Sequence, residues 1–286
     1  MDWNIEEMVN EIHNGSWEDI LPKIPSDTVD LIVTSPPYNI DLGQSSGKSS
    51  YESHDDNMPY ESYLVWMKDL FVQCNRVLKH GGRMCINIAD GANGSIPTHA
   101  HMISIITSLF KQRDAALIFD PYDGYEPFDY ITTIVWDKLQ MGSSTAWGSW
   151  QSPSCPSFPT QFEFILIAGK GTKKHEGDKD KVTVSKDNFI RNSRALWKFN
   201  PENKMKEMGH PAMFPEELPC RLIDQLSYAG DVVLDPFNGL GTTTCVAKRM
   251  GRQYIGIEKS KHYYEKSLVR IGAVPDVVDG TPSWMT

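Results

Sequence analysis

The C-terminal part of the chain contains a succession of strand, loop, helix and strand patterns that strongly constrains the fold. The apolar run DVVLD (231–235) leads through the loop PFNGLG (236–241) into the helical pattern TTTCVAKRM (242–250), and QYIGIE (253–258) follows. Two short β-branched runs joined by a helix predict a right-handed crossover between parallel strands. Because a parallel sheet is covered on both faces, this unit predicts an α/β fold.

Patterns of the same two kinds precede and follow this unit. Helical periodicity occurs in residues 1–12, 60–79, 98–114, 215–227 and from 261 onward. We expect the second of these helices to end through a left-handed cap at Gly81–Gly82. Strands are predicted at 29–33, 83–89, 131–137 and 162–169. The prediction is one α/β domain with a largely parallel sheet, made of residues 1–138 and 207–286, with an inserted region at 139–206.

Composition excludes several classes of protein. With 40% hydrophobic and 23% charged residues among 286, the chain has a globular composition. No apolar run approaches the ~20 residues needed to span a bilayer, and the acidic N-terminus is unlike a signal peptide. Five cysteines without a C-x-x-C pair indicate reduced thiols in a cytoplasmic protein, with neither disulfides nor metal ligands.

The net charge of −9 is unevenly distributed along the chain. Residues 169–206 carry eleven Lys and Arg against five Asp and Glu, so a basic segment lies within an acidic protein. Such a segment is typical of a phosphate-binding surface or of a solvated loop of mixed charge, and composition favours neither.

The glycine-rich loop has the features of a nucleotide-type cofactor site. Asp235 ends one predicted strand, and Glu258 ends the next, where a carboxylate can accept hydrogen bonds from ribose hydroxyls. Thr242–Thr244 stand where a dinucleotide motif needs its third glycine. An Asp at the strand end suits the ammonium group of a methionine moiety and repels a pyrophosphate. The loop therefore favours S-adenosylmethionine over NAD.

The stretch TSPPYNI (34–40) follows the apolar run VDLIV (29–33) directly. Two consecutive prolines make a stiff turn at the carboxyl end of a strand, where α/β sheets bind ligands. Ser35 Oγ and the Pro36 carbonyl could accept the two hydrogens of an exocyclic amino group, and Tyr38 offers a stacking face. This arrangement suits a flipped-out base whose amino group faces an electrophilic methyl. Two acceptors would localise the nitrogen lone pair and stabilise the developing positive charge.

TSPPY, HPAMFPEELPCRLI, DPFNGLGTT and YIGIE, in this order, resemble the β-class of amino-methyltransferases that act on DNA. These bacterial and archaeal enzymes make N4-methylcytosine or N6-methyladenine, commonly in restriction–modification systems, on a Rossmann-like S-adenosylmethionine-dependent methyltransferase sheet. The resemblance covers residues 14–271. The chain departs from it at Gly15–Ser16, where the family often has Gly-Asp, which leaves an acidic cofactor contact there in doubt.

The resemblance implies roles for named residues. The catalytic turn would consist of Ser35, Pro36, Pro37 and Tyr38. The cofactor would be bound by Asp235, Pro236, Phe237, Gly239, Gly241, Thr242 and Glu258, with His210, Pro211 and Phe214 beside its methionine part. The resemblance also implies double-stranded DNA as the substrate, allows a separate cognate restriction endonuclease, and is compatible with a homodimer, for which no segment marks an interface.

Ser at the first position of the catalytic turn favours cytosine N4, and adenine N6 remains the alternative. We expect target recognition in the region 139–206. Its candidate DNA contacts are Lys170, Lys173, Lys174, Arg191, Arg194, Trp147 and Trp150, although for the two tryptophans an anchoring role, packing their loop onto the sheet, is favoured over base contact. Two other classes stay open: an amino-methyltransferase acting on RNA or protein, and an inert relative that only binds the cofactor.

Overall fold

The computed structural model describes residues 4–39, 58–91, 96–108, 126–139, 148–149, 151–156, 158, 160–202 and 213–275. Its strands are β1 (Glu11–Asn14), β2 (Val29–Thr34), β3 (Leu78–Ala89), β4 (Phe128–Asp137), β5 (Phe162–Lys170), β6 (Leu196–Lys198), β7 (Val232–Asp235) and β8 (Gln253–Glu258). The helices are α1 (Ile5–Met8), α2 (Trp17–Ile20), α3 (Tyr60–Val77), α4 (Thr98–Ser108), α5 (Lys186–Asn192), α6 (Glu217–Leu226), α7 (Thr242–Arg249) and α8 (Lys261–Gly272), with short 3₁₀ turns at Leu21–Lys23 and Lys179–Lys181.

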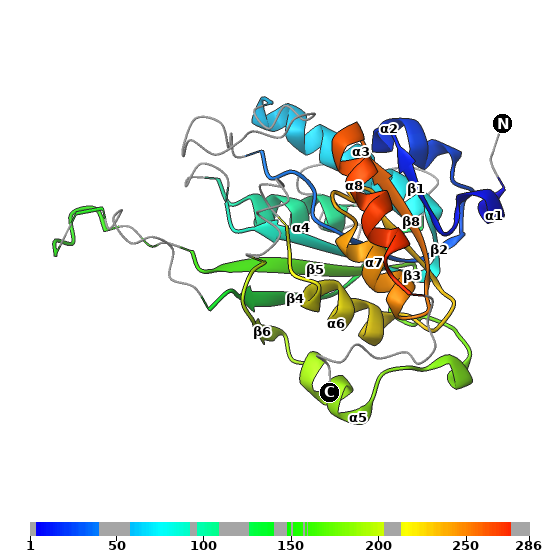
Figure 1. Ribbon diagram of the computed structural model, residues 1–286. Helices are drawn as coiled ribbons and strands as arrows, with labels where there is room; N and C mark the ends of the chain where they lie inside the picture. The colour runs from blue at the N-terminus through cyan, green and yellow to red at the C-terminus, as the bar shows by residue number, and fades with distance from the viewer. Residues whose placement is uncertain are drawn as a thin grey trace.

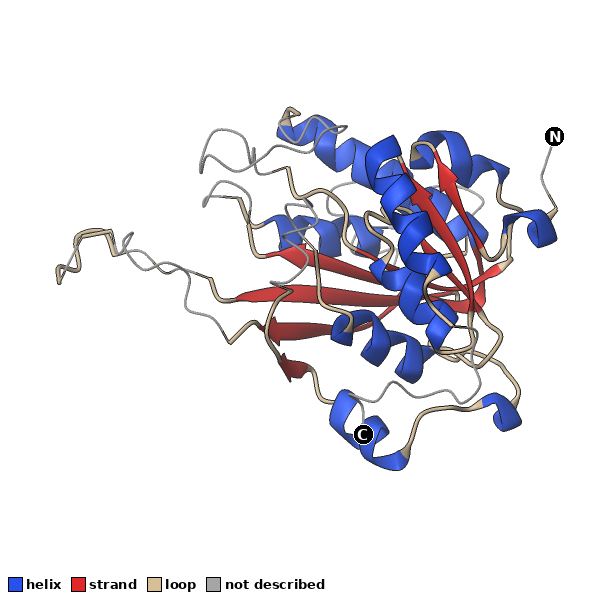
Figure 2. Cartoon of the chain, viewed as in Figure 1, coloured by secondary structure: helices blue, strands red, loops and turns tan. Residues whose placement is uncertain are grey.

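The described strands form one eight-stranded sheet in the order β1-β8-β7-β2-β3-β5-β4-β6 (Figures 1 and 2). The first five strands in this order run parallel to one another, and β5 is antiparallel to both β3 and β4. The predicted α/β class is confirmed, with an antiparallel strand inside an otherwise parallel sheet. Strands β2 and β7 are neighbours, so the segments that follow Thr34 and Asp235 start side by side.

Helices cover both faces of the sheet (Figure 1), and their buried apolar side chains form one layer on each face. On one face, α2, α3 and α4 pack their buried side chains against β2, β3 and β5 around Phe71, Met84 and Leu166. On the other face, α6, α7 and α8 pack against β2, β7 and β4 around Leu222, Val246 and Trp136. None of the described helices is long and apolar enough to cross a membrane.

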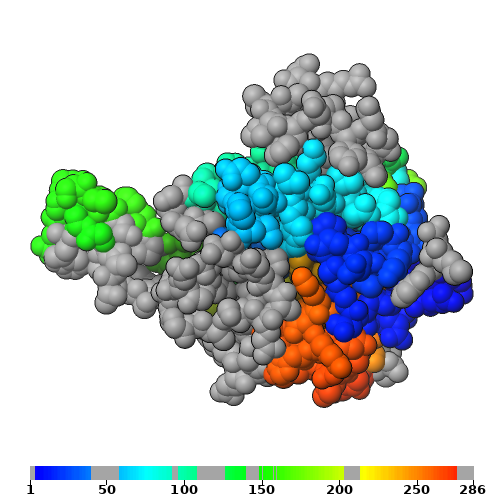
Figure 3. Space-filling model, turned by 90° about the horizontal axis from the view of Figure 1, so that it is seen from above, coloured from blue at the N-terminus to red at the C-terminus, as the bar shows by residue number. Residues whose placement is uncertain are grey.

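The structure corrects two sequence-based element assignments. The helix predicted for residues 1–12 is a single turn, because Glu11–Asn14 instead pair with β8 as a parallel edge strand, which places the N-terminal and C-terminal segments side by side (Figure 3, blue and orange). Helix α3 ends at Val77 with an extended residue, Leu78, and not at a glycine cap. Gly81 lies inside β3 with φ of 77°, where a Cβ would come within 2.2 Å of the Lys174 carbonyl oxygen.

The connection between β4 and β5 opens at the same sheet edge as the turn after β2. The last residue of β4, Asp137, pairs with Phe162, and Glu163 pairs with Ala89 at the carboxyl end of β3. Figure 1 shows the described residues 148–156 (green) standing away from the sheet beyond this edge. Residues 162–170 belong to the predicted insertion, yet they form a central strand of the common sheet. A role of residues 139–206 in target recognition stays a prediction.

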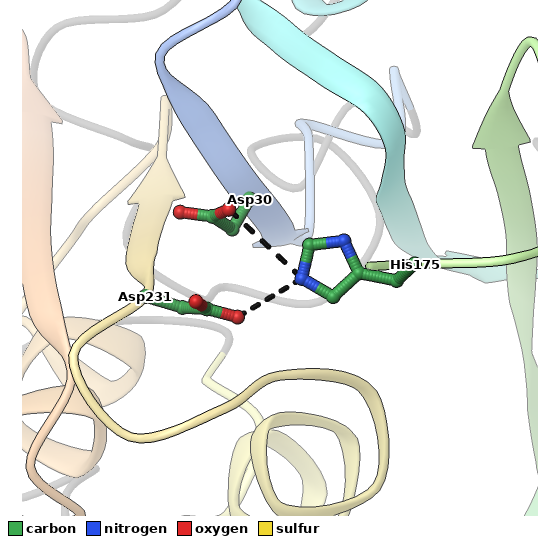
Figure 4. Close-up of side chains that lie close together, drawn as sticks. All are labelled: Asp30, His175 and Asp231. Atoms are coloured by element: carbon green, nitrogen blue, oxygen red, sulfur yellow. Dashed lines mark hydrogen bonds and ion pairs between the residues drawn. The ribbon is translucent and has the colours of Figure 1, made fainter. Parts of the chain in front are cut away.

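At the opposite sheet edge, His175 lies between Asp30 and Asp231 (Figure 4). Its Nε2 is 3.0 Å from Asp231 Oδ2 and 3.9 Å from Asp30 Oδ1, and the three side chains are close enough together to surround one cation. The Lys79 ammonium, however, already lies 2.8 Å from both oxygens of Asp30, which also accepts the Val232 N–H at 2.9 Å. The cluster is therefore an ion-pair junction between the starts of β2, β3 and β7.

We expect Asp30→Ala to destabilise the protein by about 3 kcal/mol, because it leaves a buried N–H unsatisfied and removes a buried carboxylate from its charged partners. Urea unfolding measures this. The control is Glu176→Ala, which removes only an exposed pair with Lys174 and should leave the midpoint unchanged. If EDTA lowered the stability of the wild-type protein as much as Asp30→Ala does, the cluster would be a metal site and not an ion-pair junction.

Candidate active site

A cavity of about 410 Å³ lies at the carboxyl ends of β2, β7 and β8, where parallel α/β sheets bind ligands. It is lined from the N-terminal segment by Gly15, Ser16, Trp17 and Glu18, from the proline turn by Ser35, Pro36, Pro37 and Tyr38, from the next helix region by Met58 and Trp66, and from the C-terminal part by Met213, Phe214, Asp235, Pro236, Phe237, Asn238, Gly239, Leu240, Thr242, Ile257, Glu258, Lys259 and Tyr263. The predicted catalytic turn and cofactor loop therefore share one cavity.

The Ser35–Tyr38 turn is held by a compact hydrogen-bond network. Ser35 Oγ lies 2.9 Å from Tyr38 Oη and 3.3 Å from the Asn87 carbonyl oxygen. Asn87 Nδ2 donates to Tyr38 Oη at 2.8 Å and to Glu163 Oε2 at 2.6 Å. Tyr38 Oη also donates to Glu163 Oε2 at 3.2 Å. These bonds fix the orientation of the Tyr38 ring beside the cavity.

The backbone of the same turn is fixed by two further contacts. Tyr63 Oη on α3 donates to the Pro37 carbonyl at 2.8 Å. Asn39, with φ of 55°, exchanges two hydrogen bonds with the backbone of Met58, at 2.9 and 3.0 Å. These contacts fix the backbone of the turn on both sides of Tyr38, and Pro36 lines the cavity beside them.

Asp235 is buried at the carboxyl end of β7, where it lines the cavity. Its Oδ1 accepts hydrogen bonds from Thr34 Oγ1 at 2.6 Å and from the Phe237 N–H at 3.0 Å. Burial, only partly offset by these donors, raises the pKa of Asp235 to about 6. A buried carboxyl with so few charged neighbours has a strong tendency to bind a cation.

Glu258 binds the glycine-rich loop from the end of β8. Its two oxygens accept hydrogen bonds from the Gly239 N–H at 2.7 Å and the Ser260 N–H at 2.8 Å. Burial is the main cause that raises the pKa of Glu258 to about 7, and the nearby Asp235 adds to it. The carboxylate thus shapes the loop and borders the cavity.

Two glycines allow this loop to lie close to the sheet. Gly241 precedes α7 with φ of 81°, a conformation that L side chains rarely adopt. A Cβ on Gly256 in β8 would come within 2.8 Å of the Asn238 side chain, which accepts a hydrogen bond from Thr244 Oγ1. Gly256 therefore makes room for the buried Asn238 beneath the loop.

Aromatic rings form the remaining wall of the cavity. Trp66 lies between Trp17 and Phe237, with ring centroids 5.7 and 5.6 Å apart, and its Nε1 donates to Glu18 Oε1 at 2.6 Å. Although Gly15–Ser16 lacks the acid that the family often has, Glu18 brings a carboxylate from this segment to the cavity. The combination of rings and acids suits a ligand with a flat heterocycle and cationic or hydroxyl groups.

Most of the predicted catalytic and cofactor residues line the one cavity: Ser35, Pro36, Pro37, Tyr38, Phe214, Asp235, Pro236, Phe237, Gly239, Thr242 and Glu258. Gly241 is not among the lining residues and lies at the start of α7. His210, Pro211, Trp147 and Trp150 lie outside the described residues.

The assignment of Lys170 to DNA contact is wrong. This side chain is buried at the end of β5, where its ammonium donates to Asp27 Oδ1 at 2.6 Å and to the Leu78 carbonyl at 2.8 Å. It is engaged in an internal ion pair and cannot neutralise a phosphate.

The other basic candidates are exposed but do not border the cavity. Lys173 and Lys174 follow β5 at the sheet edge opposite the catalytic turn, where the Lys173 carbonyl accepts a hydrogen bond from Arg83 at 3.2 Å. Arg191 on α5 bonds the Asn188 side chain, and Arg194 precedes the edge strand β6. Because β2 is six residues long, about 20 Å separates the two sheet edges. DNA contact by these four residues stays a prediction.

Sequence reasoning missed Asn87, Glu163, Tyr63 and Trp66. The first two did leave a signal, since each is a polar residue inside an otherwise apolar strand pattern, RMCINIA and FEFILIAG. Tyr63 and Trp66 belong to the amphipathic pattern of α3 and could not be distinguished from ordinary core residues.

Comparison with known proteins identifies the family. The model of the N6_N4_Mtase family, described as DNA methylase, matches residues 29–269, so the chain belongs to this family of DNA amino-methyltransferases. The resemblance stated from the sequence motifs is confirmed.

Several relatives share most of the chain. The type II methyltransferase M.BglII from Bacillus subtilis is 30% identical over 97% of this chain and 73% of its own length. M.MjaVI from Methanocaldococcus jannaschii is 34% identical over 63% of this chain and 81% of its own length. TTHA0409 from Thermus thermophilus, solved in complex with S-adenosyl-L-methionine, superposes with a TM-score of 0.67 at 27% identity, covering 94% of this chain and 99% of the other.

Asp235→Asn is expected to stabilise the ligand-free protein at high pH. A carboxyl whose pKa is higher in the folded than in the unfolded protein contributes its full stabilisation at pH values below the unfolded pKa. For Asp235 that stabilisation is lost as the pH rises through the folded pKa of about 6. The amide keeps an oxygen for Thr34 and Phe237 and carries no charge. The variant should therefore unfold with a free energy about 2 kcal/mol larger than wild type at pH 8, and the difference should shrink at pH 5.

Urea unfolding at the two pH values measures this difference. Glu265→Gln, an exposed substitution on α8, is the matched control and should change neither value. Equal stability of Asp235→Asn and wild type at pH 8 would contradict a buried, ionised Asp235.

Proposed function

We propose that this protein transfers a methyl group from S-adenosyl-L-methionine to N4 of a cytosine flipped out of double-stranded DNA. The joint lining of one cavity by the Ser35–Tyr38 turn and the Asp235 and Glu258 carboxylates supports methyl transfer to a base, and Ser35 at the first position of the turn supports cytosine. DNA amino-methylation itself follows from family membership. Cytosine as the target base is the part that we propose.

The cavity residues fit the cofactor. Buried Asp235, with its raised pKa, matches an α-ammonium group, and Glu258 beside the Gly239 N–H matches ribose hydroxyls. Trp66 and Phe237 supply apolar faces for an adenine ring. S-Adenosyl-L-methionine is the cofactor, and when bound it supplies an electrophilic methyl group.

The residues of the turn would act on the amino group of the base. Ser35 Oγ and the Pro36 carbonyl accept its two hydrogens, which localises the nitrogen lone pair toward the methyl carbon. Transfer of the cofactor's methyl group would leave a positive charge on this nitrogen, which the two acceptors would stabilise until solvent water takes one of its protons. The Tyr38 ring, held by Asn87 and Glu163, stacks on the base.

Cytosine is favoured over adenine by Ser35 at the first position of the turn. Adenine N6 is the alternative, since the same two acceptors would also orient a purine amino group. The type II names of the relatives support a place in a restriction–modification system, in which a separate endonuclease cleaves the unmodified target. A homodimer stays a prediction from the family resemblance.

Nucleoside mass spectrometry tests the target base. Purified protein is incubated with unmethylated DNA and methyl-labelled cofactor, and the DNA is digested to nucleosides. Labelled N4-methylcytosine is expected, whereas labelled N6-methyladenine would overturn the base and keep the mechanism. Label in RNA or protein, and none in DNA, would overturn the substrate class.

Tyr38→Ala is the paired variant, expected to lose turnover while binding the cofactor normally.

Cofactor affinity should rise with pH. The ionised forms of Asp235 and Glu258 bind the ligand's ammonium and hydroxyl groups, and their pKa values are raised to about 6 and about 7. Between pH 5.5 and 7.5 the dissociation constant should therefore fall about tenfold or more. Calorimetry measures it, and Glu258→Gln should flatten the upper part of the curve. A pH-independent affinity would contradict carboxylate recognition of the cofactor.

A further inference from the structure

Glu163 lies beside the catalytic turn, and the proposed function gives it no contact with the cofactor or the base. It lies near the start of β5, opposite Ala89, and its side chain is largely buried, with 12% exposed. Its Oε1 forms an ion pair with the Lys138 ammonium, at the end of the β4 segment. This leaves Oε2 to accept hydrogen bonds from Tyr38 and Asn87.

The carboxylate determines how the surrounding hydrogen bonds are directed. An ionised carboxylate only accepts, so the Asn87 amide must present Nδ2 to it, and the second Nδ2 hydrogen then goes to Tyr38 Oη. The single Tyr38 hydroxyl hydrogen goes to Glu163 as a charge-assisted bond. With its own hydrogen directed to Glu163, Tyr38 Oη can only accept a hydrogen bond from Ser35.

Because the Tyr38 hydrogen points to Glu163, Ser35 Oγ does not receive a hydrogen bond from Tyr38. Its hydroxyl hydrogen can go to Tyr38 Oη or to the Asn87 carbonyl, and in either case the lone pairs of Oγ stay available. If the Tyr38 hydrogen pointed to Ser35 instead, it would occupy one of the two lone pairs of Oγ and reduce the capacity of this oxygen to accept from the amino group of the base.

We propose that Glu163 is a positioning residue for methyl transfer, whose carboxylate takes the hydrogen bond of the Tyr38 hydroxyl and so keeps Ser35 Oγ an acceptor for the target amino group. Glu163 acts through Tyr38 and does not touch the base. The inference rests on the proposed function of the Ser35–Tyr38 turn.

Glu163→Gln tests this role without changing side-chain size. The amide can donate to Tyr38 Oη, which turns the Tyr38 hydrogen toward Ser35. We expect the single-turnover rate with saturating cofactor and DNA to fall about ten- to hundredfold, with cofactor affinity by calorimetry within about twofold of wild type.

Tyr38→Phe supplies the decisive comparison, because it keeps the stacking ring and removes the competing hydroxyl. Alone it should slow transfer by less than about fivefold, and combined with Glu163→Gln it should restore the rate to that of Tyr38→Phe. If the two side chains only supported the fold, the rate loss of the double variant would be the product of the losses of the two single variants. A double variant as slow as Glu163→Gln, or a Glu163→Gln rate equal to wild type, would overturn the proposal.

Two further measurements separate the remaining causes. Lys138→Gln removes the ion pair but keeps the carboxylate, so its rate should stay within about threefold of wild type; a loss equal to that of Glu163→Gln would also overturn the proposal. If Glu163→Gln does not fold, a loss of more than about tenfold in Tyr38→Phe alone would overturn it. Absence of methylation by the wild-type protein would overturn the proposed function together with the role of Glu163, whereas normal wild-type methylation without restoration would overturn only that role.

Discussion

The buried hydrogen bond from Thr34 Oγ1 to Asp235 Oδ1, 2.6 Å long, joins the ends of two strands that are 201 residues apart in the chain. It depends on the parallel pairing of β2 with β7, in which Leu31 lies opposite Val233. Because both strands end at the same edge, the Ser35–Tyr38 turn and the glycine-rich loop begin beside each other. In the proposed function a methyl group passes directly between the ligands of these two segments, so this strand pairing is a structural condition for the proposed reaction.

Two acidic side chains are buried next to this contact, although burial of carboxyl groups does not favour folding. Asp235 and Glu258 are both buried, both have raised pKa values, and each raises the electrostatic cost of ionising the other. Backbone N–H groups of Phe237, Gly239 and Ser260 compensate only part of that cost. In the proposed function the ammonium group of the cofactor would complete this compensation, which would favour its binding.

Sequence reasoning found the parts of the site that local chemistry dictates. A double proline after an apolar strand and a glycine loop between a strand and a helix are visible without any tertiary contact, and the structure brings both to one cavity. Lys170 was misassigned because nothing in its neighbourhood shows that Asp27 lies beside it in the fold. Edge strand β1 was hidden for a similar reason, since four residues become a strand only through pairing with β8. Asn87 and Glu163 acquire their roles from the register of β3 against β5.

The antiparallel direction of β5 also explains why the β4–β5 connection opens at the active-site edge. In a parallel sheet, strands end at the ligand-binding edge and the chain returns through helices on the faces. Because β5 runs the other way, it begins at that edge, and the connection from Asp137 to Phe162 starts and finishes beside the Ser35–Tyr38 turn. Lys138 directly follows Asp137 and Glu163 directly follows Phe162, so their ion pair joins the two ends of this connection.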